Sequence, residues 1–478
     1  MEVHIMNKKV LSLGVMLSLA TTGAMAADVV TTSVNNGDQL SKYQKEAIQL
    51  TQKQLAEKSV QDSKTYESKL DLDESRTIDL ALANNRTAKQ TKWGYEAAKS
   101  AVSQVAAGKN PSVSYGWSAQ KTGGDTGRGK SGSHNFSISA PVFNPQLDAS
   151  IDSARYTREG TGASYEEALQ QAKYDAISGY YTLIMNRNLV DVAQQAVKDY
   201  QGHVTNVQAQ YNVGLVASSD VLAAKTNLAD SETSLVKAQN AANLAEASLN
   251  QVIAYPVQTA INTAEHDLQY KPYNITLEQA KAYALLHRSA LVKSAKSGYL
   301  PTVAVKAGRG YADPDGYFGT STKSWSVGAT ASWSLWDGGA TQNAIKKANA
   351  QLEQAKEANL ATVDAVLLAV QKAYLNLRSA EQTIQSTQTA VAQGQESFRI
   401  ATLRYRAGVG TNLDVLDAET KLTDARNNYV QALYNYNISI AALEQLTGVP
   451  LNTPVGQGAQ IIANSGAAEQ LAQLGGNQ

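Results

Sequence analysis

The sequence predicts a mixed α+β membrane protein, mainly α-helical. Four strands per chain would form a trimeric 12-stranded β-barrel, which a long α-helical coiled-coil barrel would continue. Three observations predict this fold class. The chain contains an internal duplication, two long stretches repeat apolar residues every seven positions, and four short segments alternate apolar with small polar residues.

The two halves of the chain repeat one another at an offset of 194 residues. When Tyr180–Pro256 is aligned with Tyr374–Pro450, 22 of 77 pairs are identical, well above the handful that chance would give. Each half should therefore follow one plan: a helix, two strands, a long helix and a return helix. We expect repeat one over residues 77–256 and repeat two over residues 276–450.

Apolar residues recur every seven positions along both long helices and their return helices. In repeat two the seam consists of Val363, Val370, Leu377, Ile384, Val391, Phe398 and Tyr405. Such spacing keeps one seam against a partner helix, as in coiled coils. The stretch Asn144–Tyr211 alone would form roughly 100 Å of helix, which implies a rod or tube. Periodicity by itself also fits a plain coiled-coil stalk.

The four strand segments are residues 111–120, 135–143, 302–310 and 325–336. One face carries aromatic and aliphatic side chains, including Val142, and the other carries mostly Ser, Gly and Thr. Arg309 falls on the apolar face at a strand end, where its long side chain could reach lipid headgroups. This alternation is typical of transmembrane β-strands, although a soluble hairpin with one buried face shares it.

Four strands cannot close a barrel, and unpaired peptide groups at an open edge are very costly in lipid. The barrel must therefore be shared between chains. Two chains would supply eight strands and three would supply twelve. We favour three, because their helix pairs form a ring wide enough to be hollow.

Residues 1–26 read as a secretory signal peptide, with a basic start, a short apolar run and Ala24-Met25-Ala26 before the cleavage point. No later stretch approaches 18 apolar residues, so we expect no transmembrane helix. Polar segments should follow at 27–76, between the repeats at 257–275 and at the C-terminal tail, 451–478.

Composition argues against several classes of protein. With 42 basic and 42 acidic residues there is no charge excess for nucleic acid, and without Cys there is no thiol chemistry. The five His are scattered, and no catalytic or nucleotide-binding motif occurs. We therefore expect no enzyme, no cofactor and no metal site.

Two Gly-containing turns at equivalent places, within Asn212–Val221 and Tyr405–Ala418, give the chain a specific resemblance. Together with the duplication and the strand pairs, they make residues 77–450 similar to the TolC family of trimeric outer-membrane ducts. The resemblance implies an outer-membrane barrel on a periplasmic helical tunnel, with an equatorial belt from the segments 27–76, 257–275 and 451–478.

The resemblance also implies partners and a role. It implies a homotrimer in outer-membrane lipid, a periplasmic adaptor (membrane fusion) protein, and an inner-membrane pump of the RND, ABC or MFS class. The chain would then conduct substrates passively in a tripartite efflux or type I secretion system, with multidrug resistance as one outcome. The alternative is a structural coiled-coil surface or adhesin-type protein that transports nothing.

The family closes its tunnel at the periplasmic helix tips. By motif match the gate falls on Asp220, Tyr405, Asp414 and Asp417, and the adaptor-docking tips are Gly214, Leu215, Val216, Gly408 and Val409. Asp414 and Asp417 share a helix face and would form an acidic ring around a threefold axis. From spacing alone they fit equally ordinary acids near a helix N-terminus, and the turns fit simple turn chemistry.

Three features depart from the family pattern. Gly410 stands where well-studied members have an arginine that helps to hold the closed state. That contact is therefore missing here, or Arg404 or Arg406 supplies it instead. The passage 288–301 is shorter than its counterpart in repeat one. The polar stretch 39–69 has no counterpart that we can assign.

Overall fold

The computed structural model describes residues 69–124, 127–286, 302–313, 322–332 and 336–467. The predicted signal peptide, almost all of the stretch 39–69 and the shortened passage 288–301 therefore lie outside the described residues. The chain divides into two units at residue 70, and nearly all described residues belong to the unit Asp71–Gln478.

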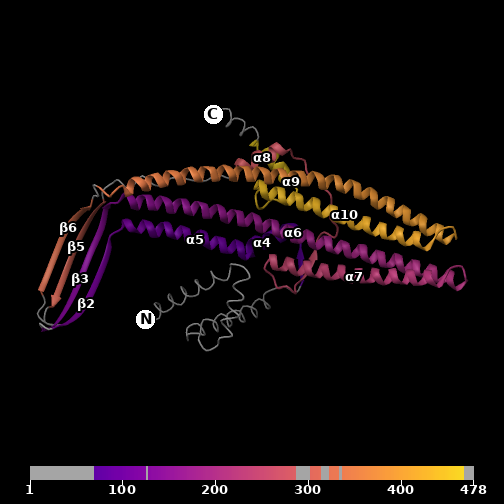
Figure 1. Ribbon diagram of the computed structural model, residues 1–478, viewed down its shortest axis with the longest axis horizontal. Coiled ribbons are helices and arrows are strands. Elements are labelled where there is room, and N and C mark those ends of the chain that lie inside the picture. Colours follow the sequence, from indigo (N-terminus) through magenta and orange to yellow (C-terminus); the bar gives the residue numbers. More distant parts are fainter. Residues whose placement is uncertain (1–68, 125–126, 287–301, 314–321, 333–335, 468–478) are drawn as a thin grey trace. The chain divides into compact units, whose positions relative to one another are not determined.

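Two long helical hairpins dominate this unit (Figure 1). The first consists of α6 (Pro145–Asn212) and α7 (Ser218–Val252), and the second of α9 (Ala340–Arg406) and α10 (Asn412–Thr447). Helix α6 packs along α7, α9 packs along α10, and α10 also packs on α6. Because α6 and α9 end 194 residues apart, the duplication found in the sequence recurs in the structure.

Shorter elements support the hairpins. Helices α4 (Glu74–Asn84) and α5 (Arg86–Ala106) pack on α6, and the 3₁₀ turn η1 (Ala107–Lys109) follows α5. Helix α8 (Leu277–Leu286) packs on α9, and α11 (Gly458–Asn464) packs on α8. Strands β1 (Lys69–Leu72) and β4 (Ala260–Thr263) form a two-stranded sheet.

Capping residues fix where several helices begin. The Asp73 side chain accepts a hydrogen bond from the Arg76 N–H, and that of Asn85 accepts one from the Ala88 N–H. Asn144 caps α6 in the same way, and Pro145 occupies the first helical position. These side chains satisfy N–H groups that the first helical turn leaves unpaired.

The main sheet is antiparallel, in the order β2-β3-β5-β6. Strands β2 (Ser112–Gly124) and β3 (Gly127–Phe143) both continue into the loop expected between them, whereas β5 (Thr302–Asp313) and β6 (Thr322–Ser332) stay closer to expectation. The pairing of β3 with β5 joins the two repeats. Within the described residues β2 and β6 each pair on one side only.

The register places one kind of side chain on each face. Tyr115 lies opposite Phe136, Phe136 opposite Arg309, and Arg309 opposite Trp325. Serine pairs fill the other face and hydrogen-bond across the strands: Ser112 with Ser139 (2.7 Å), Ser114 with Ser137 (2.6 Å) and Ser118 with Ser133 (2.8 Å). Sequence alternation therefore predicted the faces correctly, including the place of Arg309.

One irregularity interrupts the pairing of β3 with β5. A register shift between Pro141 and Phe143 puts Phe143 opposite Val303, because a bulge inserts one extra residue. Among the described residues, one helix, α9, is long and apolar enough by length and composition to cross a membrane. Coiled-coil helices rich in Ala and Leu share this composition, and α9 packs along α10; the absence of a transmembrane helix stays a prediction.

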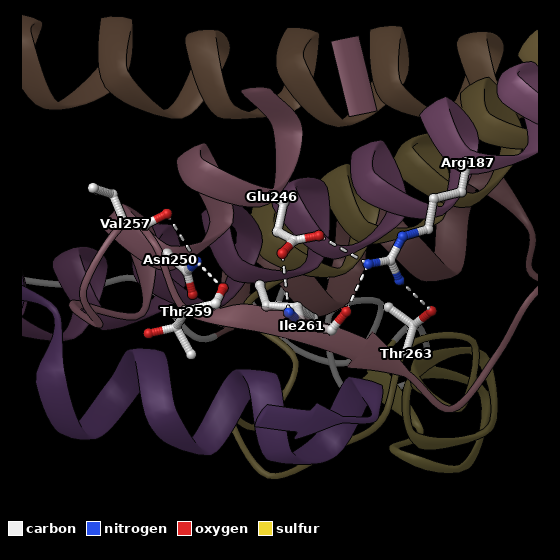
Figure 2. A network of polar contacts seen from close by, with 7 residues as sticks. All are labelled: Arg187, Glu246, Asn250, Val257, Thr259, Ile261 and Thr263. Atoms are coloured by element: carbon white, nitrogen blue, oxygen red, sulfur yellow. Dashed lines mark hydrogen bonds and ion pairs between the residues drawn. The ribbon is translucent and has the colours of Figure 1, made fainter. Parts of the chain in front are cut away.

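The linker after α7 folds back onto its hairpin through Arg187 (Figure 2). The Arg187 guanidinium donates to Glu246 Oε2 on α7 (3.0 Å), to the Ile261 carbonyl (2.6 Å) and to Thr263 Oγ1 (3.0 Å). Glu246 Oε1 in turn accepts from the Ile261 N–H (3.1 Å). One half-buried ion pair thus attaches β4 to both α6 and α7.

The two return helices capture the chain that follows them from equivalent positions. In repeat one Asn250 Nδ2 donates to the Thr259 carbonyl (2.8 Å). The equivalent residue in repeat two is Glu444, whose Oε1 accepts from the N–H groups of Gly456 (2.9 Å) and Gly458 (3.0 Å). Glu444 is almost fully buried, and this burial raises its pKa to about 7.

The two turns between the long and return helices share one backbone geometry. Gly214 (φ 77°) and Gly408 (φ 71°) are left-handed. The Leu215 N–H donates to the Gln210 carbonyl and the Val409 N–H to that of Arg404. These are Schellman motifs, which glycine favours because it has no Cβ. Left-handed glycines therefore end both long helices, in keeping with the turn chemistry expected from the sequence.

Gly410 lies tightly against the end of α9. A Cβ at this position would lie 3.0 Å from the Tyr405 main-chain nitrogen and 3.1 Å from Arg404 Cβ. Backbone atoms of a packed helix cannot yield easily, so a side chain here would force the turn to move. Any larger side chain at this position, arginine included, would meet the same atoms.

Glu444 should make stability depend on pH. Its pKa is raised, so the folded chain binds more protons than the unfolded chain between pH 4.5 and about 7, and stability falls as pH rises through this window. Glu444→Gln keeps the acceptor for Gly456 and Gly458 without the charge. At pH 8 we expect the variant to have a higher thermal unfolding midpoint than the wild type, corresponding to a free energy of unfolding that is larger by up to about 3 kcal/mol. Near pH 4 the two midpoints should match.

The control for this experiment is Glu444→Ala, which leaves the two N–H groups without their acceptor and should destabilise the fold at every pH. A pH-independent difference between wild type and Glu444→Gln in thermal melts would contradict the assignment.

Gly410→Ala should destabilise the second turn by roughly 1–3 kcal/mol, because the added methyl group meets main-chain atoms. The matched control is Gly202→Ala on α6, where a Cβ meets nothing within 4 Å and helix propensity should stabilise by about 0.5–1 kcal/mol. Amide hydrogen exchange of residues 404–414 measures the effect. Equal exchange in the two variants would show that Gly410 is not under steric constraint.

Candidate functional site at the helix turns

One apolar cluster joins the two hairpins next to their turns. Its buried members come from all four long helices: Val207 from α6, Val221 and Ala224 from α7, Tyr405 from α9, and Val415 from α10. Four partly buried side chains pack against it, namely Val204, Val216, Phe398 and Ala401. Of the residues predicted for the gate, Tyr405 lies in this shared core, and Asp220 and Asp414 precede its members Val221 and Val415.

Tyr405 lies inside this cluster and is only 4% exposed. Its ring centroid is 5.2 Å from that of His203. Its hydroxyl has no hydrogen-bond partner among the described residues. Burial and the nearby Asp220 carboxylate raise the pKa of this hydroxyl. Tyr405 and Asp220 are thus brought together, through an electrostatic interaction and without a direct hydrogen bond.

A second polar link crosses the same junction. Buried His203 on α6 shares a 2.7 Å hydrogen bond between its Nε2 and Asn412 Oδ1 on α10. Asn412 Nδ2 donates to the main-chain carbonyl of Asp220 on α7 (3.3 Å). Sequence analysis missed both His203 and Asn412. Although both stand at helical positions close to the turns, no local pattern distinguishes them.

Asp414 begins α10 as part of a capping box. Its carboxylate accepts from the Thr411 N–H (3.0 Å), and its own N–H donates to Thr411 Oγ1 (3.1 Å). These bonds to Thr411, with the nearby Arg404 guanidinium, lower the pKa of Asp414. Asp414 therefore does act as an acid at a helix N-terminus, which was the alternative expected from its spacing.

Asp414 and Asp417 are exposed and line one open groove between α9 and α10, of about 760 Å³. The predicted shared face is thus present. The groove also contains two cations that sequence analysis did not associate with it, Arg404 and Lys421. The positive charges of Arg404 and Lys421 therefore offset part of the negative potential that Asp414 and Asp417 create in this groove.

The apolar turn residues divide into two groups. Leu215 and Val409 are exposed, at 74% and 66%, whereas Val216 packs against the apolar cluster. Although Val216 is grouped with the adaptor-docking tips on the expectation that it is exposed, it is half-buried, because the chain has already turned back toward α7 at this point. Val213 and Leu413 are exposed as well, and both lie off the seven-residue seam.

Among the described residues, no group of three or more His, Asp or Glu side chains is placed to hold a metal ion. What the junction offers is a packed contact between four helix ends, with polar links across it and charges around it. Such a contact can hold two hairpins together or let them separate.

Comparison with known proteins identifies the family. The family model described as outer membrane efflux protein matches residues 77–254 and 274–449. The outer membrane protein TolC of Escherichia coli is 25% identical over 312 residues, 60% of this chain and 63% of TolC. Protein CyaE of Bordetella pertussis is 33% identical over 169 residues, 35% of this chain and 36% of CyaE. The chain thus matches less than two thirds of these relatives' lengths.

Solved structures show the same fold. CusC superposes with a TM-score of 0.68 at 17% identity, covering 78% of this chain and 91% of CusC. The outer membrane protein VceC of Vibrio cholerae gives 0.65 at 18% identity, covering 78% and 96%. The resemblance to the TolC family is confirmed. Because the family model matches both repeats, the chain belongs to the outer membrane efflux protein family, whose members lie in the outer membrane.

Proposed function

We propose that the chain is one third of a trimeric channel-tunnel that conducts substrates passively across the outer membrane. The observation that carries this proposal is the sheet β2-β3-β5-β6. It has an apolar, aromatic face, a serine-lined face, and two outer strands that pair on one side only among the described residues.

Pairing between chains would satisfy those outer strands. If β6 of each subunit pairs with β2 of the next, three copies close a barrel of twelve strands with no open edge. Tyr115, Phe136 and Trp325 would then face lipid, as aromatic residues do at membrane interfaces, and the serine face would line a wet lumen.

The helical hairpins would continue this lumen into the periplasm. The linker 257–275 and the tail 451–478 would form part of an equatorial belt, a role supported by their return onto the helices through Arg187, Asn250 and Glu444. Signal-peptide cleavage after residue 26 would deliver the chain to that compartment.

The proposed system has three parts: this channel, a periplasmic adaptor and an inner-membrane pump that supplies the energy. The names of relatives support export of either kind. AprF of Pseudomonas aeruginosa is named for alkaline protease secretion, and TtgC of Pseudomonas putida as a probable efflux pump outer membrane protein. The exposed Leu215 and Val409 beside Gly214 and Gly408 would give the adaptor its apolar contact.

Gating belongs to the helix tips in this proposal. The contact around Tyr405 and Asp220 would hold the closed state, and opening would be a rotation of the return helices against the long ones. Asp414 and Asp417 from three subunits would place six carboxylates around the axis. Two like charges at about 4 Å cost roughly 4 kcal/mol at an effective dielectric near 20, so cations should be favoured.

The channel proposal predicts a trimer that conducts ions. We expect the detergent-purified protein to migrate as a heat-sensitive trimer and to produce single-channel steps in planar lipid bilayers, with the heat-denatured sample as the control. A coiled-coil surface protein would give no such steps. A monomer that stays in solution without detergent would refute the shared barrel.

The acidic ring predicts a specific loss of selectivity. Neutralising it with Asp414→Asn and Asp417→Asn together should lower the cation-to-anion permeability ratio toward one, by at least about threefold. Asparagine keeps an acceptor for the Thr411 N–H. The control is Asp267→Asn, an exposed linker carboxylate, which should leave the ratio unchanged. Unaltered selectivity in the double variant would exclude these carboxylates from the gate.

A further inference from the structure

The four helix ends meet at one imidazole. His203 belongs to α6 and contacts the Tyr405 ring of α9. Through Asn412 of α10 it is linked to the Asp220 carbonyl of α7. His203 is 4% exposed, and Asn412 is 9% exposed. His203 thus contacts both hairpins, through a ring contact and through a hydrogen-bonded chain.

The hydrogen bonds determine the tautomer of His203. Because Asn412 Nδ2 donates to the Asp220 carbonyl, the amide oxygen of Asn412 faces the imidazole and must accept. Nε2 of His203 therefore carries the proton, and Nδ1 carries a lone pair. This Nδ1 is buried and has no hydrogen-bond partner among the described residues.

We propose that His203 is a positioning residue of the gate: neutral, it keeps the helix tips closed, and protonated, it lets them separate. A second proton would go to Nδ1, and would place an N–H donor and a positive charge where the described residues provide no acceptor. The cost disappears only when the imidazole reaches water, so protonation favours separation of α6 from α9 and α10.

The direction of the pH effect follows from burial. Desolvation lowers the pKa of His203 below its usual value of 6.5 in the closed tips. A solvated imidazole in separated tips would titrate near that usual value. The separated state then binds more protons below pH 6.5, so the contribution of His203 to closure is fully present above this pH and decreases on acidification.

Other ionisable groups near His203 do not supply the same response. On α10, Glu419 has a pKa raised to about 8 by burial and is already protonated at pH 7, while the pKa of Asp414 is lowered. Tyr405 on α9 has a raised pKa and stays neutral. The packed helices carry further charged groups, among them Asp199 on α6, Asp220 and Lys225 on α7, Arg404 and Arg406 on α9, and Asp417, Lys421 and Arg426 on α10.

This inference rests on the proposed channel, and it predicts how strongly the gate should respond to pH. Between pH 6.5 and the lowered pKa, the ratio of separated to closed tips should rise by up to about tenfold per pH unit for each His203. If three subunits open together, the rise in open probability would be steeper. The effect should saturate at low pH, because every His203 is then protonated.

The decisive variant is His203→Gln, whose amide nitrogen can donate to Asn412 Oδ1 but cannot titrate in this range. Open probability of the trimer in planar bilayers is measured from pH 7.5 to pH 5. We expect the wild type to be mostly closed at pH 7.5 and to open on acidification, and His203→Gln to stay closed throughout. His203→Ala, which loses both ring and donor, should open at every pH.

The matched control is His266→Gln. His266 is exposed and lies beside Asp191 and Asp267, so its replacement should preserve the wild-type response. Migration of each variant as a trimer in detergent checks folding. An acid response that persists in His203→Gln, or a conducting wild type with no acid response, would overturn the inference alone. Absence of conducting trimers for every variant at every pH would overturn the proposed function and this inference with it.

Discussion

The need to pair main-chain N–H and C=O groups is the constraint on which the architecture depends. In lipid there is no water to satisfy them, so a sheet with open outer strands is excluded. The sheet β2-β3-β5-β6 meets this need only in its interior as far as the described residues extend. The proposed assembly of subunits would meet it at the outer strands too, and the duplication supplies one hairpin of strands from each repeat.

The duplication is also visible at the ends of the return helices. Each repeat ends its return helix with a polar side chain that captures the chain beyond it, Asn250 in one case and Glu444 in the other. The amide does so without charge, whereas the carboxylate can ionise, and in both side chains one oxygen has no hydrogen-bond partner among the described residues. Duplication thus preserved the position of the contact while its chemistry diverged, and only the second version carries a group that can titrate.

Features that repeat along the chain could be predicted, and features that join distant segments could not. Seven-residue spacing located α6 and α9, and alternation gave the strand faces, because both depend on local periodicity. Strands β2 and β3 were predicted too short, since the Gly-rich, basic stretch 121–133 has no alternation. His203 and Asn412 are 209 residues apart, and no local sequence pattern predicts a contact over such a separation.

The tips combine good packing with unpaired polar atoms, a combination that suits the proposed gate. Val207, Val221 and Val415 are buried, yet His203 Nδ1, Tyr405 Oη and Thr402 Oγ1 have no hydrogen-bond partner among the described residues. Each such atom costs free energy that water would return on separation. Apolar burial therefore favours closure while the polar atoms oppose it. In the proposed channel, this opposition is what a bound adaptor, or one proton per subunit at His203, would act on.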